Sequence, residues 1–241
     1  MDKSAFISGL NRAFSQNGIS RMLTRDAGEN FFLMTERLIA ENEKHNLTAI
    51  REPEKIIYLH LVDCALLSPF IPKGAAVIDI GCGAGFPSLP LAILRDDIKI
   101  CALDATAKRT AYVAETAAML GLENLTVVTG RAEDVVANMR GSFDIAVSRA
   151  VAEMRIMSEL ALPFVRVGGQ LLAMKGSRGK YELSDAKRAI AILGGRGGEC
   201  LDIKISAPGE VIEHTVIRVK KETKTPAGYP RAYAQISKKP L

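Results

Sequence analysis

The sequence predicts an α/β protein with a doubly wound, mostly parallel β-sheet and a helical N-terminal extension. From about residue 73 onward, short apolar strands alternate with helical segments, and a glycine-rich turn follows the first strand. Strands separated by helices require crossover connections, which place helices on both faces of a parallel sheet. With 241 residues, 48% of them hydrophobic, the chain can bury a sizeable core. We therefore divide it into a helical extension (1–72), a sheet domain (73–221) and a tail (222–241).

The extension is predicted to be helical because its apolar residues recur at helical spacing. The clearest run falls mostly on one face of a 3.6-residue period and comprises Phe31, Leu33, Met34, Leu38 and Ile39. Pro53 lies where a further helix can begin, and Pro69 and Pro72 end the helical region.

Five strands are predicted to alternate with helices in the sheet domain. The strands are residues 75–80, 98–103, 125–129, 143–147 and 170–174, and the helices are residues 106–120, 151–165 and 181–193. Two further apolar segments, 200–205 and 214–219, are predicted to form a C-terminal hairpin. This hairpin would add an antiparallel strand to an otherwise parallel sheet.

The positive charge is concentrated near the C-terminus. From Arg218 to Leu241, seven basic residues and one acidic residue give +6, so the rest of the chain carries −1 of the total of +5. Such a segment can bind nucleic-acid phosphates or an anionic surface, and it can also serve solubility alone. The prolines of the tail disfavour an amphipathic membrane helix.

The sequence also indicates where the protein is found. No apolar run approaches the ~18 residues of a membrane span, and the first residues lack the apolar core of a signal peptide. We expect a cytoplasmic monomer that does not bind membranes. The four cysteines include no Cys-x-x-Cys pair, which disfavours a metal site and disulfides and predicts inert thiols.

The glycine-rich turn is the main candidate for a binding site. Gly81, Gly83 and Gly85 alternate in it, so that a ligand can approach the backbone closely. Asp104 ends the next strand, where its carboxylate can accept both hydroxyls of a ribose. A dinucleotide site normally has G-x-G-x-x-G spacing, whereas this turn has G-x-G-x-G spacing after Asp79. The Asp79 carboxylate would repel a pyrophosphate but can pair with the amino group of S-adenosylmethionine, which we therefore favour over NAD.

Residues after the third and fourth strands are further candidates for this site. Ala132 and Glu133 could flank an adenine, although Glu133 alone would suit a solvated helix cap. Arg149 ends the fourth strand, where its guanidinium can hold a carboxylate, a phosphate or the O6 atom of guanine. An ion pair with Asp144 or Glu153 is the structural alternative for Arg149.

Four residues are candidates for RNA contacts. Lys175 follows the fifth strand and Arg231 lies in the basic tail, and either can bind phosphate. A solvated lysine is the alternative at position 175. His60 is predicted to contact RNA or to brace its helix against the sheet, and Asn46 to touch substrate or to cap a turn.

Several motifs taken together resemble one protein family. They are Asn46-Leu47-Thr48, His60-Leu61-Val62-Asp63, the segment from Asp79 to Pro87, and Ser148-Arg149-Ala150. From about Leu33 to the last residue the chain resembles the bacterial small-subunit ribosomal RNA methyltransferase G family, also called glucose-inhibited division protein B. The tail departs from the family pattern after Pro230-Arg231, where Ala232-Tyr233-Ala234-Gln235 follows.

The resemblance implies a Rossmann-like class I methyltransferase fold. It implies methyl transfer from S-adenosylmethionine to N7 of one guanine in small-subunit (16S) ribosomal RNA, with ribosomal RNA or the small subunit particle as the partner. The cofactor residues that it implies are Gly81, Phe86, Ala132, Glu133 and Arg149.

For such a reaction the protein mainly has to hold the nucleophile, the methyl carbon and the sulfur in line. Guanine N7 has a lone pair and no proton to lose, so no general base is required. The sequence agrees, since Ser148-Arg149-Ala150 stands where amino-group methyltransferases usually have Asn/Asp-Pro-Pro-aromatic, and no cysteine has the setting of a C5-methylation nucleophile. The alternatives are a nicotinamide-dependent oxidoreductase, a non-catalytic RNA-binding module and a small-molecule methyltransferase.

Overall fold

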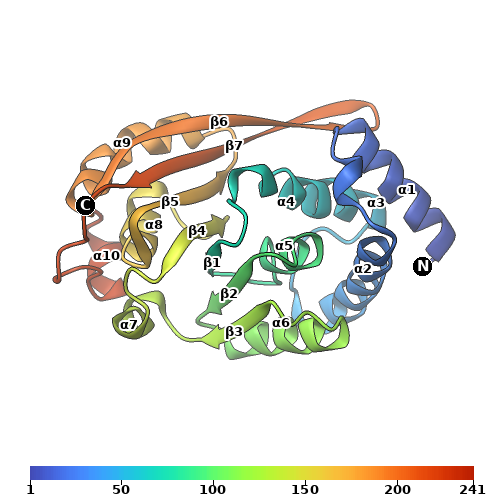
Figure 1. Cartoon of the computed structure of the whole chain (residues 1–241), viewed down its shortest axis with the longest axis horizontal. Coiled ribbons are helices and arrows are strands. Elements are labelled where there is room, and N and C mark those ends of the chain that lie inside the picture. Colours follow the sequence, from blue (N-terminus) through green and yellow to red (C-terminus); the bar gives the residue numbers. More distant parts are fainter.

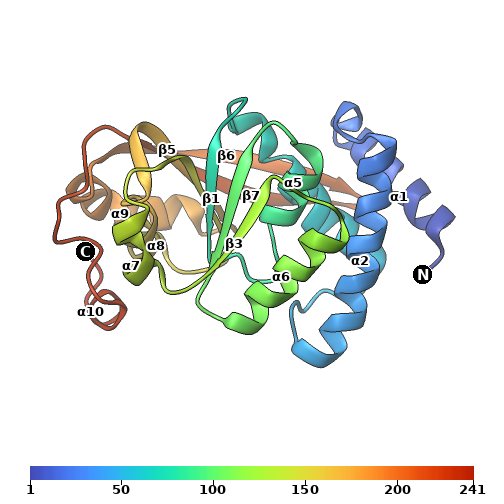
Figure 2. The same cartoon turned by 60° about the horizontal axis from the view of Figure 1, so that its bottom comes forward.

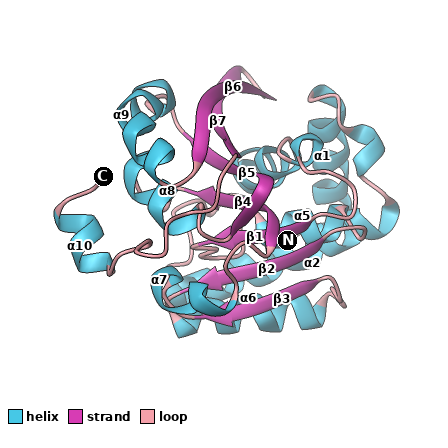
Figure 3. Cartoon of the chain, turned by 60° about the vertical axis from the view of Figure 1, so that its left-hand side comes forward, coloured by secondary structure: helices cyan, strands magenta, loops and turns pink.

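The computed structural model describes all 241 residues and contains one seven-stranded sheet (Figures 1 and 3). Its strands are β1 (Ala76–Ile80), β2 (Lys99–Asp104), β3 (Leu125–Thr129), β4 (Phe143–Arg149), β5 (Val165–Lys175), β6 (Gly195–Ala207) and β7 (Glu210–Lys221). The order is β3-β2-β1-β4-β5-β7-β6, in which β1 to β5 run parallel and β7 is antiparallel to both of its neighbours. The predicted doubly wound sheet with a C-terminal hairpin is confirmed. The strand order reverses between β1 and β4, where such sheets form a ligand crevice.

The N-terminal helices complete one face of the sheet (Figure 2). That face is covered by α1 (Lys3–Gln16), α2 (Arg25–His45), α5 (Ser88–Leu94) and α6 (Ala107–Met119). Phe14 and Phe31 lie in the same buried cluster as Val77 and Ile100 of the sheet. Residues 1–72 therefore share the core of the sheet domain and have no separate one.

A helical stretch connects α2 to the sheet. It comprises α3 (Pro53–Ile56), a π-helical segment (Ile57–Val62) and α4 (Asp63–Ala65). As expected, α3 begins at Pro53. The π-helical turn was not predicted, because side-chain spacing does not distinguish a local widening of the helix.

Four helices cover the other face of the sheet. They are α7 (Ala132–Val135), α8 (Met154–Ala161), α9 (Gly179–Ile192) and α10 (Tyr233–Lys238). Met157, Ile190 and Ile236 from three of these helices are buried with Ile78 of β1. Short 3₁₀ helices lie at Ser20–Met22, Ser68–Phe70 and Val136–Asn138. None of the helices is both long and apolar enough to cross a bilayer.

Two predicted boundaries were wrong around α8 and β5. The helix predicted over 151–165 is confined to Met154–Ala161. Leu162 still has helical dihedral angles, but Pro163 has no amide hydrogen to continue the helix. β5 begins at Val165 and not at residue 170, so Gly168 and Gly169 lie within the strand. The β4–β5 register shifts between Phe143 and Ile145, beside these glycines. Gly168 and Gly169 therefore accommodate an irregularity in the β4–β5 pairing, and they do not form the turn that was predicted before β5.

The C-terminal hairpin extends well beyond its predicted length. β6 and β7 reach across the molecule to α1, as Figure 1 shows. There the Asn17 side chain donates to the Ser206 carbonyl at 3.1 Å and accepts from the Ser206 amide at 2.8 Å. The hairpin thus holds the N-terminal helices against the sheet.

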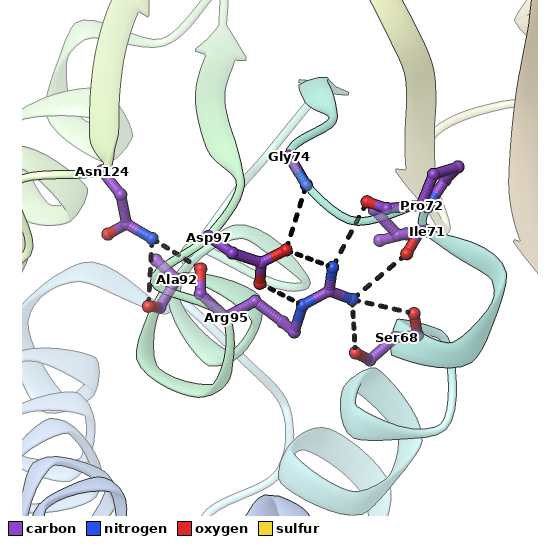
Figure 4. A network of polar contacts seen from close by, with 8 residues as sticks. All are labelled: Ser68, Ile71, Pro72, Gly74, Ala92, Arg95, Asp97 and Asn124. Atoms are coloured by element: carbon purple, nitrogen blue, oxygen red, sulfur yellow. Dashed lines mark hydrogen bonds and ion pairs between the residues drawn. The ribbon is translucent and has the colours of Figure 1, made fainter.

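Arg95 makes a second connection between these parts (Figure 4). Its guanidinium pairs with Asp97 at 2.5 and 2.8 Å, and this pairing lowers the pKa of Asp97. The same guanidinium donates to the carbonyls of Ser68 and Ile71 at 3.2 Å, and Asp97 accepts from the Gly74 amide at 3.0 Å. The link that leads from the helical extension into β1 is therefore firmly held.

Candidate active site

The glycine-rich turn is locked to the end of β2. The amides of Gly81 and Cys82 donate to the Leu103 carbonyl at 2.8 and 3.0 Å, and the amide of Gly83 donates to Asp104 Oδ2 at 3.0 Å. Gly81 and Gly83 have φ values of 75° and 57°, which favour glycine. A Cβ atom at Gly81 would lie 2.7 Å from Val151 Cγ2, so the turn after β1 packs closely on the loop after β4.

A cavity of about 420 Å³ lies at this turn, within the ~300–1,000 Å³ range of small-molecule sites. Its lining includes the predicted cofactor residues Gly81, Gly83, Phe86, Asp104, Ala132, Glu133 and Arg149. It also includes residues to which the sequence assigned no site role, among them Thr48, Arg109, Arg131, Leu160 and Tyr233. We call this the first cavity.

Asp104 has the geometry for a ribose-binding carboxylate. It is only 5% exposed, and its two oxygens accept from the amides of Gly83 at 3.0 Å and Thr106 at 2.8 Å. A carboxylate has about four acceptor sites, so two remain for ribose hydroxyls. The backbone at Gly83 is open, because a Cβ there would have no neighbour nearer than 4.0 Å. These residues fit the ribose and backbone approach of S-adenosylmethionine.

Two predicted cofactor residues do not line the first cavity. Asp79 is fully buried, and burial raises its pKa to about 7. Its Oδ2 atom accepts from the Ser88 hydroxyl, whereas Oδ1 has no hydrogen-bond partner. Gly85 packs against Leu89 of α5, where a Cβ would collide. Both residues shape the turn from behind, and direct contact of Asp79 with a cofactor amino group stays a prediction.

A second cavity, of about 580 Å³, meets the first at Arg149, Ala150 and Val151. It is lined by the ends of β4 and β5, by His214 within β7, and by the π-helical stretch with α4. Its polar lining comprises His60, Asp63, Arg149, Glu153, Lys175, Glu182 and His214. Ala150 has a φ of 55°, which is uncommon for a residue with a side chain. Strained backbone of this kind is frequent at functional sites.

Arg149 stands where the two cavities join. Its guanidinium donates to the Leu59 carbonyl at 3.2 Å and to Asp63 Oδ2 at 3.5 Å, and it lies 3.1 Å from His60 Nδ1. It also lies over the ring of Phe86, 4.9 Å from the centroid. The acidic partner is thus Asp63, whereas the alternatives Asp144 and Glu153 were wrong: Asp144 is paired with Arg166 at 2.6 Å.

His60 is held as a neutral ring. Burial, followed by the nearby Arg149 cation, lowers its pKa to about 3. Its Nδ1 atom lies 3.0 Å from the Leu59 carbonyl and 3.1 Å from the Arg149 guanidinium, and its Nε2 atom lies 3.0 Å from Thr48 Oγ1. The ring stacks on Phe86 with centroids 4.3 Å apart. His60 therefore braces the helix and at the same time lines the second cavity.

The structure reveals one polar pair that the sequence did not predict. His214 Nδ1 lies 3.0 Å from Asp63 Oδ1, and this hydrogen bond raises the pKa of His214. Thr215 pairs with Lys175 in the ladder of β5 and β7, so His214 lies at the carboxyl edge of the parallel strands. A hairpin was predicted to contain His214, but only the register reveals which residue it faces.

The predicted RNA contacts divide into two groups. Lys175 and His60 line the second cavity, although Lys175 is largely buried and pairs with Glu182 at 2.8 Å. Arg231 and Asn46 line neither cavity. Asn46 ends α2 in the left-handed conformation, and Arg231 pairs with Glu159 at 2.6 Å. RNA binding by any of these residues stays a prediction.

Comparisons with known proteins identify the chain. Residues 29–204 match the family model described as rRNA small subunit methyltransferase G. The chain is 39% identical to a Ribosomal RNA small subunit methyltransferase G of Clostridium perfringens, over 93% of this chain and 95% of that protein. The protein of the same name from Leuconostoc citreum is 38% identical over the full length of both.

Solved structures agree with this result at the level of the fold. One, described as M. jannaschii TYW2 in complex with AdoMet, has a TM-score of 0.54 and 18% identity, covering 67% of this chain and 76% of that chain. Another, described as cofactor-bound Rv0187 from MTB, has a TM-score of 0.56 and 18% identity, covering 79% and 90% of the two chains. By its sequence, its sheet and its match over most of its length, this chain belongs to the rRNA small subunit methyltransferase G family.

Proposed function

We propose that the protein transfers a methyl group from S-adenosylmethionine to N7 of a guanine in small-subunit (16S) ribosomal RNA. The first cavity holds the cofactor and the second receives the target base. When bound, the cofactor supplies a methyl group on a sulfonium sulfur. The guanine N7 lone pair forms the new bond to carbon, the carbon–sulfur bond breaks, and its electron pair stays on sulfur.

The ion pairs of the acidic side chains in the second cavity are the main support for this proposal. Asp63 is paired with His214 and Arg149, and Glu182 is paired with Lys175. A carboxylate oxygen that already accepts from a neighbouring cation has fewer lone pairs free to take a proton from a substrate. The remaining acid, Glu153, is exposed. A site built in this way suits an acceptor that has no proton to lose, as N7 of guanine does.

The thiols support the same choice of reaction. Cys82 lines the first cavity, and burial raises the pKa of its thiol well above the usual range. Since the thiolate is the nucleophilic form, Cys82 is not activated for attack on a pyrimidine ring. The oxidoreductase and small-molecule alternatives do not agree with the family to which the chain belongs. A non-catalytic RNA-binding role remains to be tested by activity.

The test uses the full chain, methyl-labelled S-adenosylmethionine and small ribosomal subunits from cells that lack the protein. We expect one equivalent of label, recovered as N7-methylguanosine after nuclease digestion and mass spectrometry. Label on another base or another atom, or RNA binding without incorporation, would contradict the proposal.

Asp104→Asn gives a matched binding test. The amide keeps one of the two acceptors that bind the Gly83 and Thr106 amides and loses the negative charge beside the ribose. We therefore expect at least a tenfold rise in the Kd of S-adenosylmethionine by calorimetry, about 1.4 kcal/mol. Asp134→Asn removes an exposed acid outside both cavities and should bind as the wild type does. Equal affinities for the two variants would rule out the ribose role of Asp104.

A further inference from the structure

The C-terminal tail folds back onto the sheet domain and is held there on both sides of Tyr233. The Arg231 amide and Nε donate to Glu159 Oε1 at 2.9 and 2.8 Å, and a terminal guanidinium nitrogen lies 2.6 Å from Oε2. Glu159 and Ile236 are both 0% exposed. A two-pronged ion pair to a buried carboxylate before Tyr233 and a buried side chain after it therefore fix this segment in place. Figures 1 and 2 show α10 near α7 and α8.

This anchoring brings an aromatic ring of the tail to the first cavity. Tyr233 lines that cavity together with Arg131, Ala132 and Glu133. The Arg131 guanidinium carbon lies 5.6 Å from the centroid of the Tyr233 ring. The ring is nevertheless 39% exposed, so the surrounding protein leaves much of its surface uncovered. Tyrosine offers a large contact area with few rotatable bonds.

The sheet order indicates which part of the cofactor lies at this end. β3, β2 and β1 lie side by side in the sheet. Arg131–Glu133 follow the carboxyl end of β3, Asp104 ends β2, and the glycine turn follows β1. In S-adenosylmethionine the ribose lies between the adenine and the methionine. With the ribose on Asp104 and the methyl group directed toward Arg149 and the second cavity, the adenine falls at the β3 end, beside Tyr233.

From these observations we propose that Tyr233 stacks on the adenine of the bound cofactor, which makes the C-terminal tail part of the S-adenosylmethionine site. This inference rests on the proposed cofactor. Stacking of a base on an aromatic side chain contributes ~1–3 kcal/mol, which corresponds to a change of about 5- to 150-fold in Kd. The tail thus has a role in binding the cofactor that is separate from its positive charge.

The experiment is calorimetry with two ligands, S-adenosylmethionine and 5′-methylthioadenosine. The second ligand keeps the adenine and ribose but lacks the amino acid. We expect Tyr233→Ala to raise the Kd of both ligands at least fivefold, and Tyr233→Phe, which keeps the aromatic face, to bind both within about twofold of the wild type. Thermal melts of the variants check that the exposed substitution leaves the fold intact.

Tyr181→Ala is the matched control. Tyr181 is also exposed and also carries an arginine, with the Arg178 guanidinium carbon 5.7 Å from its ring centroid, but it lines neither cavity. It should bind both ligands as the wild type does. Unchanged binding by Tyr233→Ala, or a loss seen only with S-adenosylmethionine, would overturn adenine stacking while leaving the proposed function standing. Failure of the wild type to bind S-adenosylmethionine would overturn the proposed function itself.

Discussion

At the scale of single residues, His214 and Asp63 lie 151 positions apart and share a hydrogen bond that makes stability depend on pH. The contact raises the pKa of His214 from 6.5, so the folded state binds a proton that the unfolded state releases near neutral pH. The stabilisation is therefore fully present below pH 6.5 and is lost as the pH rises through the raised pKa. Because His214 is half-buried, we expect a contribution of about 1 kcal/mol.

Urea unfolding of His214→Gln at several pH values between 5.5 and 8.5 checks this prediction. The variant should be less stable than the wild type at pH 5.5, and the difference should shrink toward pH 8.5. His45→Gln provides the control, since His45 lies on α2 and contacts Glu41 instead of Asp63. A difference between His214→Gln and wild type that does not change with pH would exclude the titration.

Local motifs and long-range contacts differ in how far the sequence could predict them. The positions of Gly83 and Asp104 at one cavity followed from a turn and a strand end, each defined within a few residues. The partner of Arg149 depended on a helix 86 positions away, and Asp144 was the nearer but wrong choice. Nothing in the local sequence distinguishes a cation that faces Asp63 from one that faces Asp144.

At the scale of secondary-structure elements, Lys221 joins the ends of two helices. Its ammonium donates to the carbonyls of Leu162 and Leu193, the C-terminal cap residues of α8 and α9, at 2.9 and 2.7 Å, and also to the Thr225 hydroxyl. These three bonds use all of its donors. The positive charge also suits the negative ends of both helices. Burial nevertheless lowers the pKa of Lys221 to about 8, so the charge is retained at neutral pH against a desolvation cost.

Replacement of this lysine tests its capping role. Lys221→Met keeps most of the side-chain volume but removes one hydrogen bond from each of the two carbonyls, which keep the Val165 amide and the Thr225 hydroxyl as donors. The two lost hydrogen bonds to a charged group lead us to expect a fall of about 2 kcal/mol in the free energy of unfolding. Lys220→Met, at the exposed neighbouring position of β7, should change it by less than about 0.5 kcal/mol. Chemical denaturation at pH 7 compares the two, and equal stabilities would show that Lys221 is not a cap.

Elements were predictable where periodicity was strong and less so at their ends. β3 was predicted at its observed bounds because turns flank an apolar run. The predicted bounds of α8 and β5 were wrong, since α8 ends at Ala161 and β5 includes Gly168 and Gly169. The tail was expected to be irregular, yet α10 forms there because Ile236 finds a buried position. In α10, burial of Ile236 outweighed the local signal of the tail prolines.

At the scale of the whole molecule, the structure separates the basic residues that hold the fold from those that remain for a partner. Of the seven in residues 218–241, Arg218 pairs with Glu199, Lys221 caps two helices and Arg231 pairs with Glu159. The other four are exposed and make no ion pair: Lys220, Lys224, Lys238 and Lys239. The tail therefore offers fewer charges to RNA than its composition suggests.

These exposed lysines predict a specific salt dependence of RNA binding. Each neutralised phosphate contributes about 0.7 to the slope of log Kd against log salt for single-stranded RNA, so removing two contacts by Lys238→Gln and Lys239→Gln should lower that slope by ~1–2. The matched control is Lys73→Gln with Lys99→Gln, which removes two exposed, unpaired lysines at the amino-terminal edge of the sheet, before β1 and at the start of β2. Binding of a labelled small-subunit rRNA transcript, measured from low to high salt, compares the two double variants. Both double variants lose two positive charges, so long-range attraction of the RNA weakens equally in both. If the tail contacts the RNA, only Lys238→Gln with Lys239→Gln lowers the slope. Equal slopes for the two double variants would mean that long-range charge alone attracts the RNA.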